Sequence, residues 1–212
     1  MKFIFCLFSF LMLTTLFADN LSSLKTKAES GDKNAQFELA KCFDTGNGVV
    51  LNINEAIIWY KKAADNNHPE AQCMLGALYF AGEGVEKDKK KAFYWYEKAS
   101  NNGYVKAQIA LALCYAFGDG TKVDIDKAFN LFREASEQND PDAQYMLAEC
   151  YENGKGTKVN KTIAYSWYLI SLNNGRRDAK SNILFLEKNV LRDNEIAFGK
   201  SLANEFIESK NR

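Results

Sequence analysis

Apolar and small side chains recur at helical spacing along most of the chain. Ala71, Leu75, Gly76 and Tyr79 fall on one side of a predicted helix, and Gly82 follows as a left-handed residue past its C-terminus. Ala, Leu, Lys, Glu and Gln dominate between short glycine-containing gaps, and no alternating strand pattern competes. The pattern therefore predicts an all-α chain.

The same pattern returns every 36 residues, in segments that start at Ala35, Ala71, Ala107 and Ala143. A pair of glycines recurs in each segment: Gly46 and Gly48, Gly82 and Gly84, Gly118 and Gly120, Gly154 and Gly156. Such pairs also occur in phosphate-binding loops, but Lys87 stands where a dinucleotide fingerprint has its third glycine. Because every segment has the pair, we interpret it as a turn between two helices.

The second helix of each segment has its own start signal and its own packing pattern. A side chain suited to capping the helix N-terminus precedes it at Asn52, Asp88, Asp124 and Asn160. Bulky pairs follow within the helix at Trp59 and Tyr60, Trp95 and Tyr96, Leu131 and Phe132, and Trp167 and Tyr168. Large rings opposite Ala and Gly let two helices interlock, so each segment is predicted to be an antiparallel helix pair that stacks on the next.

The order of these residues resembles the Sel-one-like repeat, a relative of the tetratricopeptide repeat. The stretch "LGALYFAGEGVEKDKKKAFYWYEKASNNG", Leu75 to Gly103, matches it almost throughout, and the resemblance covers residues 35–178. It implies a right-handed α-solenoid of four full 36-residue repeats with terminal caps. The expected repeats are 35–70, 71–106, 107–142 and 143–178, with an N-terminal capping helix in 19–34 and a C-terminal capping helix pair in 179–212.

The first 18 residues have the pattern of a secretory signal peptide. Lys2 precedes an uncharged stretch of 15 residues, and the small residue Ala18 precedes a polar segment. We therefore expect an exported protein, periplasmic or secreted, with no integral membrane domain after cleavage. An uncleaved membrane anchor is the alternative.

The charge balance argues against nucleic acid as a partner, because Lys plus Arg and Asp plus Glu each number 27.

Few residues of the sequence are candidates for a catalytic or metal-binding role. His68, the single histidine, stands at a predicted helix N-cap, and Cys73 lies at a position that is apolar in the other repeats. No zinc-ligand spacing occurs, so neither a metal nor a cofactor is expected.

The four cysteines after the signal peptide are expected to be buried thiols. Cys42, Cys114 and Cys150 share one repeat position, and helices of adjacent repeats stand too far apart for a bridge there. The cysteine-rich branch of the resembling family, some members of which are described as β-lactamase-like, instead has a regular bridging pair. The equivalent places here hold Ser100, Ser136, Gln72 and Gln108.

The main hypothesis is a non-catalytic scaffold whose concave face binds a protein or a cell-envelope component. A β-lactamase-like hydrolase and a rigid spacer are the alternatives, and the oligomeric state stays open. Partner contacts are expected at first-helix positions away from the repeat core: Phe37, Glu38, Lys41, Met74, Phe80, Leu113, Tyr145, Met146, Glu149 and Glu152.

Overall fold

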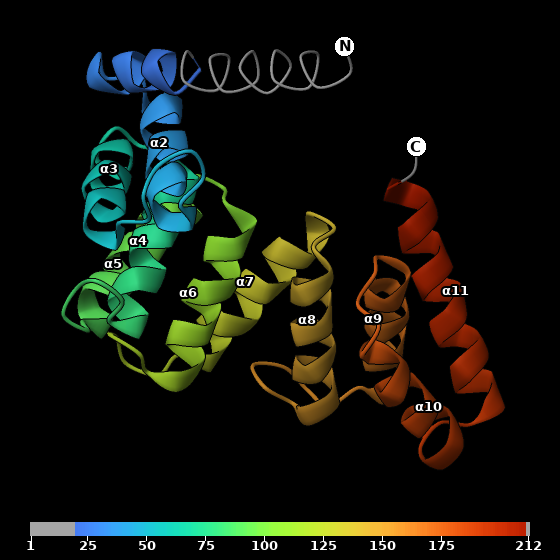
Figure 1. Cartoon of the computed structure of the whole chain (residues 1–212). Helices are drawn as coiled ribbons and strands as arrows, with labels where there is room; N and C mark the ends of the chain where they lie inside the picture. The colour runs from blue at the N-terminus through green and yellow to red at the C-terminus, as the bar shows by residue number, and fades with distance from the viewer. Residues whose placement is uncertain (1–19, 211–212) are drawn as a thin grey trace, which may run out of the picture. The chain divides into compact units, whose positions relative to one another are not determined.

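The computed structural model describes residues 20–210, in which every regular element is an α-helix (Figure 1). These residues divide into two compact units, one ending at Asn102 and the other beginning at Gly103. The predicted signal peptide, residues 1–18, lies outside the described residues. Between residues 20 and 210, no helix combines the length and the apolar character that crossing a bilayer requires.

The first unit consists of a leading helix over residues 20–29 and two helix pairs. The paired helices are α2 (Lys33–Thr45) with α3 (Ile53–Asp65), and α4 (Pro69–Ala81) with α5 (Lys89–Asn101). Helix α3 also packs against α4, so the second pair stacks on the first.

The second unit repeats this arrangement and adds two helices. Its pairs are α6 (Val105–Phe117) with α7 (Ile125–Glu137), and α8 (Pro141–Asn153) with α9 (Lys161–Asn173). Helix α7 packs against α8, while α10 (Ala179–Asn189) and α11 (Asp193–Lys210) both pack against α9. The predicted all-α fold of stacked helix pairs is confirmed.

Each second helix starts where the sequence predicts, because a side chain accepts from the free N–H groups of its first turn. The carboxylate of Asp88 accepts from the backbone N–H groups of Lys90 and Lys91, both at 3.0 Å. Asn52, Asp124 and Asn160 also cap their helices. Pro69 and Pro141 lie in the first turn of their helices, where a missing N–H costs little.

The glycine pair is a turn, as predicted, and its two members have different tasks. Gly82 ends α4 with φ of 81°, and its N–H donates to the carbonyl of Leu78 at 2.8 Å. Gly84, with φ of 67°, lies against α3 of the preceding pair: a Cβ there would stand 2.6 Å from Cδ1 of Ile57. The second glycine therefore lets the turn of one repeat approach the helix of the repeat before it.

Rings on the second helix pack against small residues on the first, which confirms the predicted interlock. A Cβ at Gly76 would stand 2.6 Å from the ring of Tyr96. Tyr60 and Tyr168 are fully buried, as are Ala40 and Ala148 at the positions equivalent to Gly76. The core of each unit is therefore a row of aromatic rings seated over Ala or Gly.

A ladder of buried glutamines ties neighbouring helices together, and the sequence analysis did not anticipate it. The amide groups of Gln36 and Gln72 donate to the carbonyls of Ala28 and Ala64, at 3.1 and 3.0 Å. Gln144 repeats this contact with the carbonyl of Ser136. The glutamine oxygens in turn accept from the amides of Asn66, Asn102 and Asn174 at the ends of the second helices. The Ala-Gln dipeptide that opens each repeat is the signal of this ladder.

Candidate functional site

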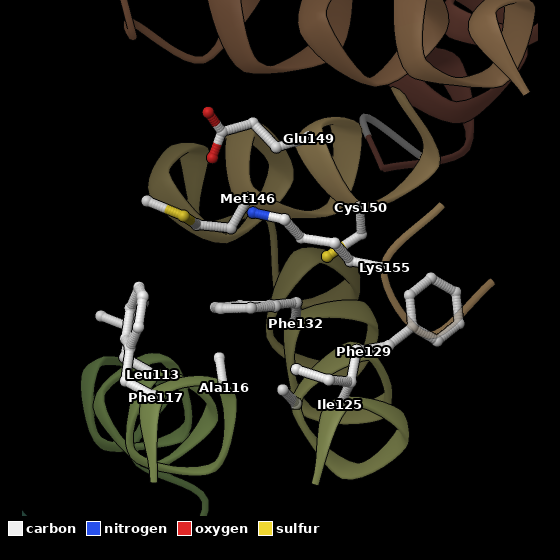
Figure 2. Close-up of a pocket in the computed structure, with 11 residues that line it drawn as sticks. Leu113, Ala116, Phe117, Ile125, Phe129, Phe132, Met146, Glu149, Cys150 and Lys155 are labelled. Atoms are coloured by element: carbon white, nitrogen blue, oxygen red, sulfur yellow. The ribbon is translucent and has the colours of Figure 1, made fainter. Parts of the chain in front are cut away.

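An apolar hollow lies on the first helices of the second unit. It has a volume of ≈ 80 Å³ and lies between α6, α7 and α8 (Figure 2). Its lining residues are Leu113, Ala116, Phe117, Ile125, Ala128, Phe129, Phe132, Met146, Glu149, Cys150 and Lys155. Three of the residues predicted as partner contacts, Leu113, Met146 and Glu149, are therefore brought together here.

Aromatic side chains form much of the hollow. Phe129 and Phe132 come from α7 and are buried, whereas Phe117 at the end of α6 is 71% exposed. The sequence analysis missed Phe117, although a comparison between repeats contains the signal. The equivalent positions hold Thr45, Ala81 and Asn153, so an exposed aromatic ring is peculiar to this repeat.

Glu149 gives the rim of the hollow a negative charge. Within residues 20–210 its carboxylate has neither a hydrogen bond nor an ion pair, and burial raises its pKa, opposed by the charges of Lys155 and Arg176. Lys155 also lines the hollow (Figure 2). The site thus combines an apolar surface with the partly buried carboxylate of Glu149.

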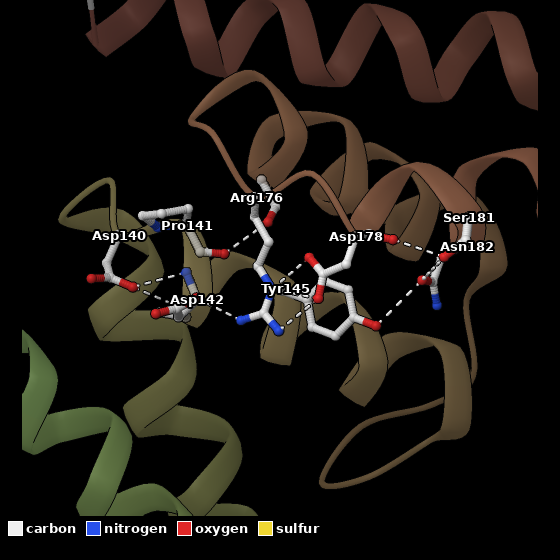
Figure 3. A network of polar contacts seen from close by, with 10 residues as sticks. Asp140, Pro141, Asp142, Tyr145, Arg176, Asp178, Ser181 and Asn182 are labelled. Atoms are coloured by element: carbon white, nitrogen blue, oxygen red, sulfur yellow. Dashed lines mark hydrogen bonds and ion pairs between the residues drawn. The ribbon is translucent and has the colours of Figure 1, made fainter.

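Tyr145, one turn before Glu149, is held in place by an arginine-centred network (Figure 3). Arg176 places its guanidinium 4.2 Å from the centre of the Tyr145 ring and pairs with the carboxylates of Asp142 and Asp178. The tyrosine hydroxyl donates to Oδ1 of Asn182 at 3.3 Å. The Arg176 hydrogen bonds and charge lower the pKa of Asp178, which keeps this carboxylate ionised. The Tyr145 ring also packs edge-on against Tyr168, so its position is fixed by contacts within the unit, and partner contact at Tyr145 stays a prediction.

Glu152 has an internal partner, so its position is explained without an external one. Its carboxylate accepts from the hydroxyl of Tyr168 at 2.8 Å and lies 3.4 Å from Nζ of Lys161. In the first unit Asp44 accepts from Tyr60 in the same way, at 3.1 Å. Partner contact at Glu152 stays a prediction.

In the first unit, one predicted contact residue is misplaced. Phe37 was expected away from the repeat core, but it is only 5% exposed and stacks on the His68 ring, with ring centroids 4.5 Å apart. The ring occupies the core because His68, at the start of α4, provides a flat surface for it. Glu38 and Lys41 form an exposed ion pair at 3.0 Å. Met74 is half-buried, and Phe80 is 36% exposed.

His68 and Ser136 have structural tasks. Nδ1 of His68 accepts from the backbone N–H of Ala71 at 3.3 Å, and burial lowers the pKa of the imidazole. The Ser136 hydroxyl donates to the carbonyl of Arg133 in its own helix at 2.7 Å. Across residues 20–210 there is no cluster of three or more His, Cys, Asp or Glu side chains arranged to hold a metal ion.

The cysteines differ from each other in burial. Cys114 and Cys150 are buried, and burial raises the pKa of the Cys150 thiol to about 11. Cys42 and Cys73 are only partly buried, so the expectation of four buried thiols is wrong for these two. Both lie on the sides of first helices that the neighbouring helices cover incompletely.

Comparison with models of known protein families finds the Sel1 repeat at residues 33–68, 69–104, 105–140 and 141–175. The chain belongs to the Sel1 repeat family. The resemblance drawn from the sequence is thereby confirmed, with repeat boundaries that begin two residues earlier than those chosen at the alanines.

Solved structures of Sel1 repeat proteins share this fold. A Sel1 repeat protein from Oxalobacter formigenes is 30% identical, with a TM-score of 0.77 over 86% of this chain and 79% of that one. A protective antigen of uropathogenic Escherichia coli strains is 33% identical, with a TM-score of 0.76 over 78% of this chain. The match covers only 36% of that antigen, so this chain corresponds to about a third of it.

More distant structures share the fold alone. The immunity protein Pa5087 from Pseudomonas aeruginosa is 22% identical, with a TM-score of 0.52 over 90% of this chain and 74% of that one. A comparison with curated proteins finds no significant match.

Proposed function

We propose that this Sel1 repeat protein is an exported, non-catalytic scaffold that binds a protein or a cell-envelope component through the surface of its first helices. The observation that carries the proposal is the hollow of the second unit, where Leu113, Phe117 and Met146 surround an apolar depression next to Glu149. Sel1 repeats typically mediate protein interactions, and His68 and Ser136 have structural tasks as a helix cap and in a bond within a helix.

The size of the hollow favours a macromolecular partner. Pockets for drug-sized ligands measure about 300–1,000 Å³, whereas this one has ≈ 80 Å³, which suits one inserted side chain. A protein partner binds through several such anchors, each surrounded by contacts that exclude water. The ring of Phe117, which is 71% exposed, is one such anchor on the surface of this unit.

The charge at the rim favours a basic group beside the inserted side chain. Glu149 is partly desolvated and has no ion pair within residues 20–210, so a Lys or Arg of the partner would stabilise it. Binding is then expected to weaken as the salt concentration rises.

Export is proposed from the N-terminal sequence, residues 1–18. Fractionation of native cells, followed by mass analysis of the purified protein, tests it. A mature chain that begins near Asp19 in the periplasmic or secreted fraction supports export, and an unprocessed chain in the cytosol refutes it.

The partner site is tested by crosslinking and capture from native cells with residues 19–212 as bait. One variant combines Phe117→Asp with Glu149→Lys in the hollow. Its matched control combines Val159→Asp with Glu134→Lys, which are also surface positions of the second unit. A partner retained by the control and lost from the hollow variant supports the proposal, provided that far-UV circular dichroism shows equal helicity. A partner captured equally by both variants places the interaction elsewhere.

A further inference from the structure

Helix α10 occupies the place of the first helix of a fifth repeat. Ala179 continues the series of alanines that open the repeats, and α10 packs against α9 as α8 packs against α7. The helix that follows does not complete the pair, because α11 lies along α9 and scarcely touches α10 (Figure 1). The surface of α10 that a second helix would cover is therefore open.

Side-chain size explains why the pair is incomplete. In the four repeats the first helix has a Gly or Ala opposite the ring of the second helix, at Ala40, Gly76, Ala112 and Ala148. The equivalent residue in α10 is Leu184, which prevents the same close approach. Asn204 stands on α11 where the repeats have Tyr or Phe.

The connection also changes. In the fourth repeat, seven residues with a glycine pair, residues 154–160, join the two helices. Between α10 and α11 only residues 190–192 remain, without glycine. Gly199 instead brings α11 against α9, since a Cβ at this position would stand 2.6 Å from the Tyr165 ring. The final helix is thus directed to α9.

The open surface of α10 is both apolar and basic. Leu184 is 42% exposed and Phe185 is 56% exposed. The exposed Lys180 and Lys188 stand one turn before and one turn after Leu184, the exposed Arg177 precedes the helix, and none of the three has an ion pair within residues 20–210. The acidic residues of the same segment, Asp178 and Glu187, pair with Arg176 and Lys200. The opposite side of the helix is buried through Ala179, Ile183 and Leu186. The open surface therefore has two large apolar side chains, with lysines one turn to either side of Leu184 that have no ion pair within residues 20–210.

We infer that α10 binds an amphipathic α-helix of a partner protein, whose apolar stripe is flanked by Asp and Glu and takes the place of the missing second helix. The repeats show that a helix is what covers this side of a first helix, and the charges select an acidic one. A second copy of this chain is disfavoured as the occupant, because pairing α10 with itself would bring Lys180 and Lys188 against like charges. The site is separate from the hollow next to Phe117.

Two synthetic peptides of equal length test this inference with the mature chain. Both have the same helical stripe of Leu and Ala, flanked by Glu in one peptide and by Lys in the other. A third peptide has the Glu flanks and a central Pro, which breaks the helix. Fluorescence anisotropy at low salt is expected to show binding of the Glu peptide at least about tenfold tighter than that of the other two.

Variants locate the binding on α10. The change of Leu184 and Phe185 to Asp is expected to abolish binding of the Glu peptide, whereas Phe117→Asp with Glu149→Lys in the hollow leaves it unchanged. Since Lys180 and Lys188 are exposed, their change to Glu preserves the fold and is expected to reverse the preference in favour of the Lys peptide.

Several outcomes overturn the inference. Equal affinity for the three peptides, or binding that survives the α10 substitutions, shows that α10 does not select an acidic helix. Vesicles of phosphatidylcholine and phosphatidylserine that bind the chain through Leu184 more tightly than the Glu peptide does would make the surface a membrane contact. Dimerisation in sedimentation experiments that Leu184→Asp abolishes would make it a self-association surface.

Discussion

Replacing Gly156 by alanine tests how the turn of one repeat fits against the repeat before it. Gly156 is the second glycine of its pair, with φ of 68°. An added Cβ would lie 2.6 Å from Cβ of Phe129 and 2.7 Å from the backbone carbonyl oxygen of Ile125. Neither atom belongs to the flexible end of a side chain, so the turn and α7 must move apart.

The expected magnitude has two parts. A left-handed backbone conformation costs a residue with a Cβ about 1–2 kcal/mol, and overpacking costs about 1–3 kcal/mol. Gly156→Ala is therefore expected to lower the free energy of unfolding by about 2–5 kcal/mol. Gly103→Ala is the matched control, because Gly103 has φ of 77° and no atom within 4 Å of its added Cβ. Gly103→Ala is expected to lower the free energy of unfolding only by the cost of the left-handed backbone, about 1–2 kcal/mol.

Urea unfolding followed by far-UV circular dichroism measures both variants against the parent chain. Gly84→Ala adds an intermediate case, because its Cβ would meet only side-chain atoms, Cδ1 of Ile57 at 2.6 Å and Cγ1 of Ile53 at 2.9 Å, which move more easily than the backbone carbonyl of Ile125. The order of destabilisation is expected to be Gly156, then Gly84, then Gly103. Equal losses at Gly156 and Gly103 would show that the turn does not need close contact with α7, and the packing argument would be wrong.

Three further predictions concern the buried polar groups. Gln144→Leu removes the bond to the carbonyl of Ser136 and the bond from the amide of Asn174, which keeps only its bond to Oδ1 of Asn139. The loss of these two bonds is expected to destabilise the chain by about 1–3 kcal/mol in urea unfolding, and an unchanged midpoint would contradict the ladder. Burial and the bond to Glu152 raise the pKa of Tyr168 above the usual 10.0, so the stability that depends on its proton is present below pH 10 and is lost as the pH rises further. Tyr168→Phe is expected to be less stable than the parent near neutral pH and to lose less stability in alkali, which thermal unfolding across this range measures. Burial lowers the pKa of His68 below 6.5, so the unfolded chain takes up the proton more readily and stability is expected to fall as the pH drops below 6.5. His68→Asn keeps the helix cap and is expected to remove this slope in the same experiment; an unchanged slope would assign it to carboxylates.

The surface residues show where prediction from the sequence reached its limit. The sequence analysis placed Phe37 away from the repeat core, but whether a ring on α2 is buried depends on the side chains that face it. His68 is that neighbour, and it lies 31 positions further along the chain. Phe117 is the opposite case, an aromatic ring that is exposed. The equivalent residues of the other repeats are polar or small, and nothing within a single repeat indicates an exposed ring at this position. Whether a side chain is exposed depends on contacts between repeats, and the sequence of a single repeat does not contain this information.

The local chemistry of each repeat was determined by the sequence. Asp88 caps a helix because its carboxylate reaches the N–H groups two and three positions ahead, and Gly82 ends one because it adopts a positive φ without strain. These effects act within a few residues, so they can be predicted from a short stretch. The period of 36 residues then determined that such pairs stack.

Only the tertiary structure decided how the fourth repeat is closed. The sequence from Ala179 loses the glycine pair, which indicates a cap, but it does not say which helix α11 covers. The structure shows α11 on α9, with Gly199 against Tyr165 and Leu184 left exposed on α10. Whether α11 packs on α10 or on α9 depends on whether Leu184 or Gly199 permits the closer approach of two helices. This depends on the shapes of two surfaces in contact, and no local sequence pattern encodes it.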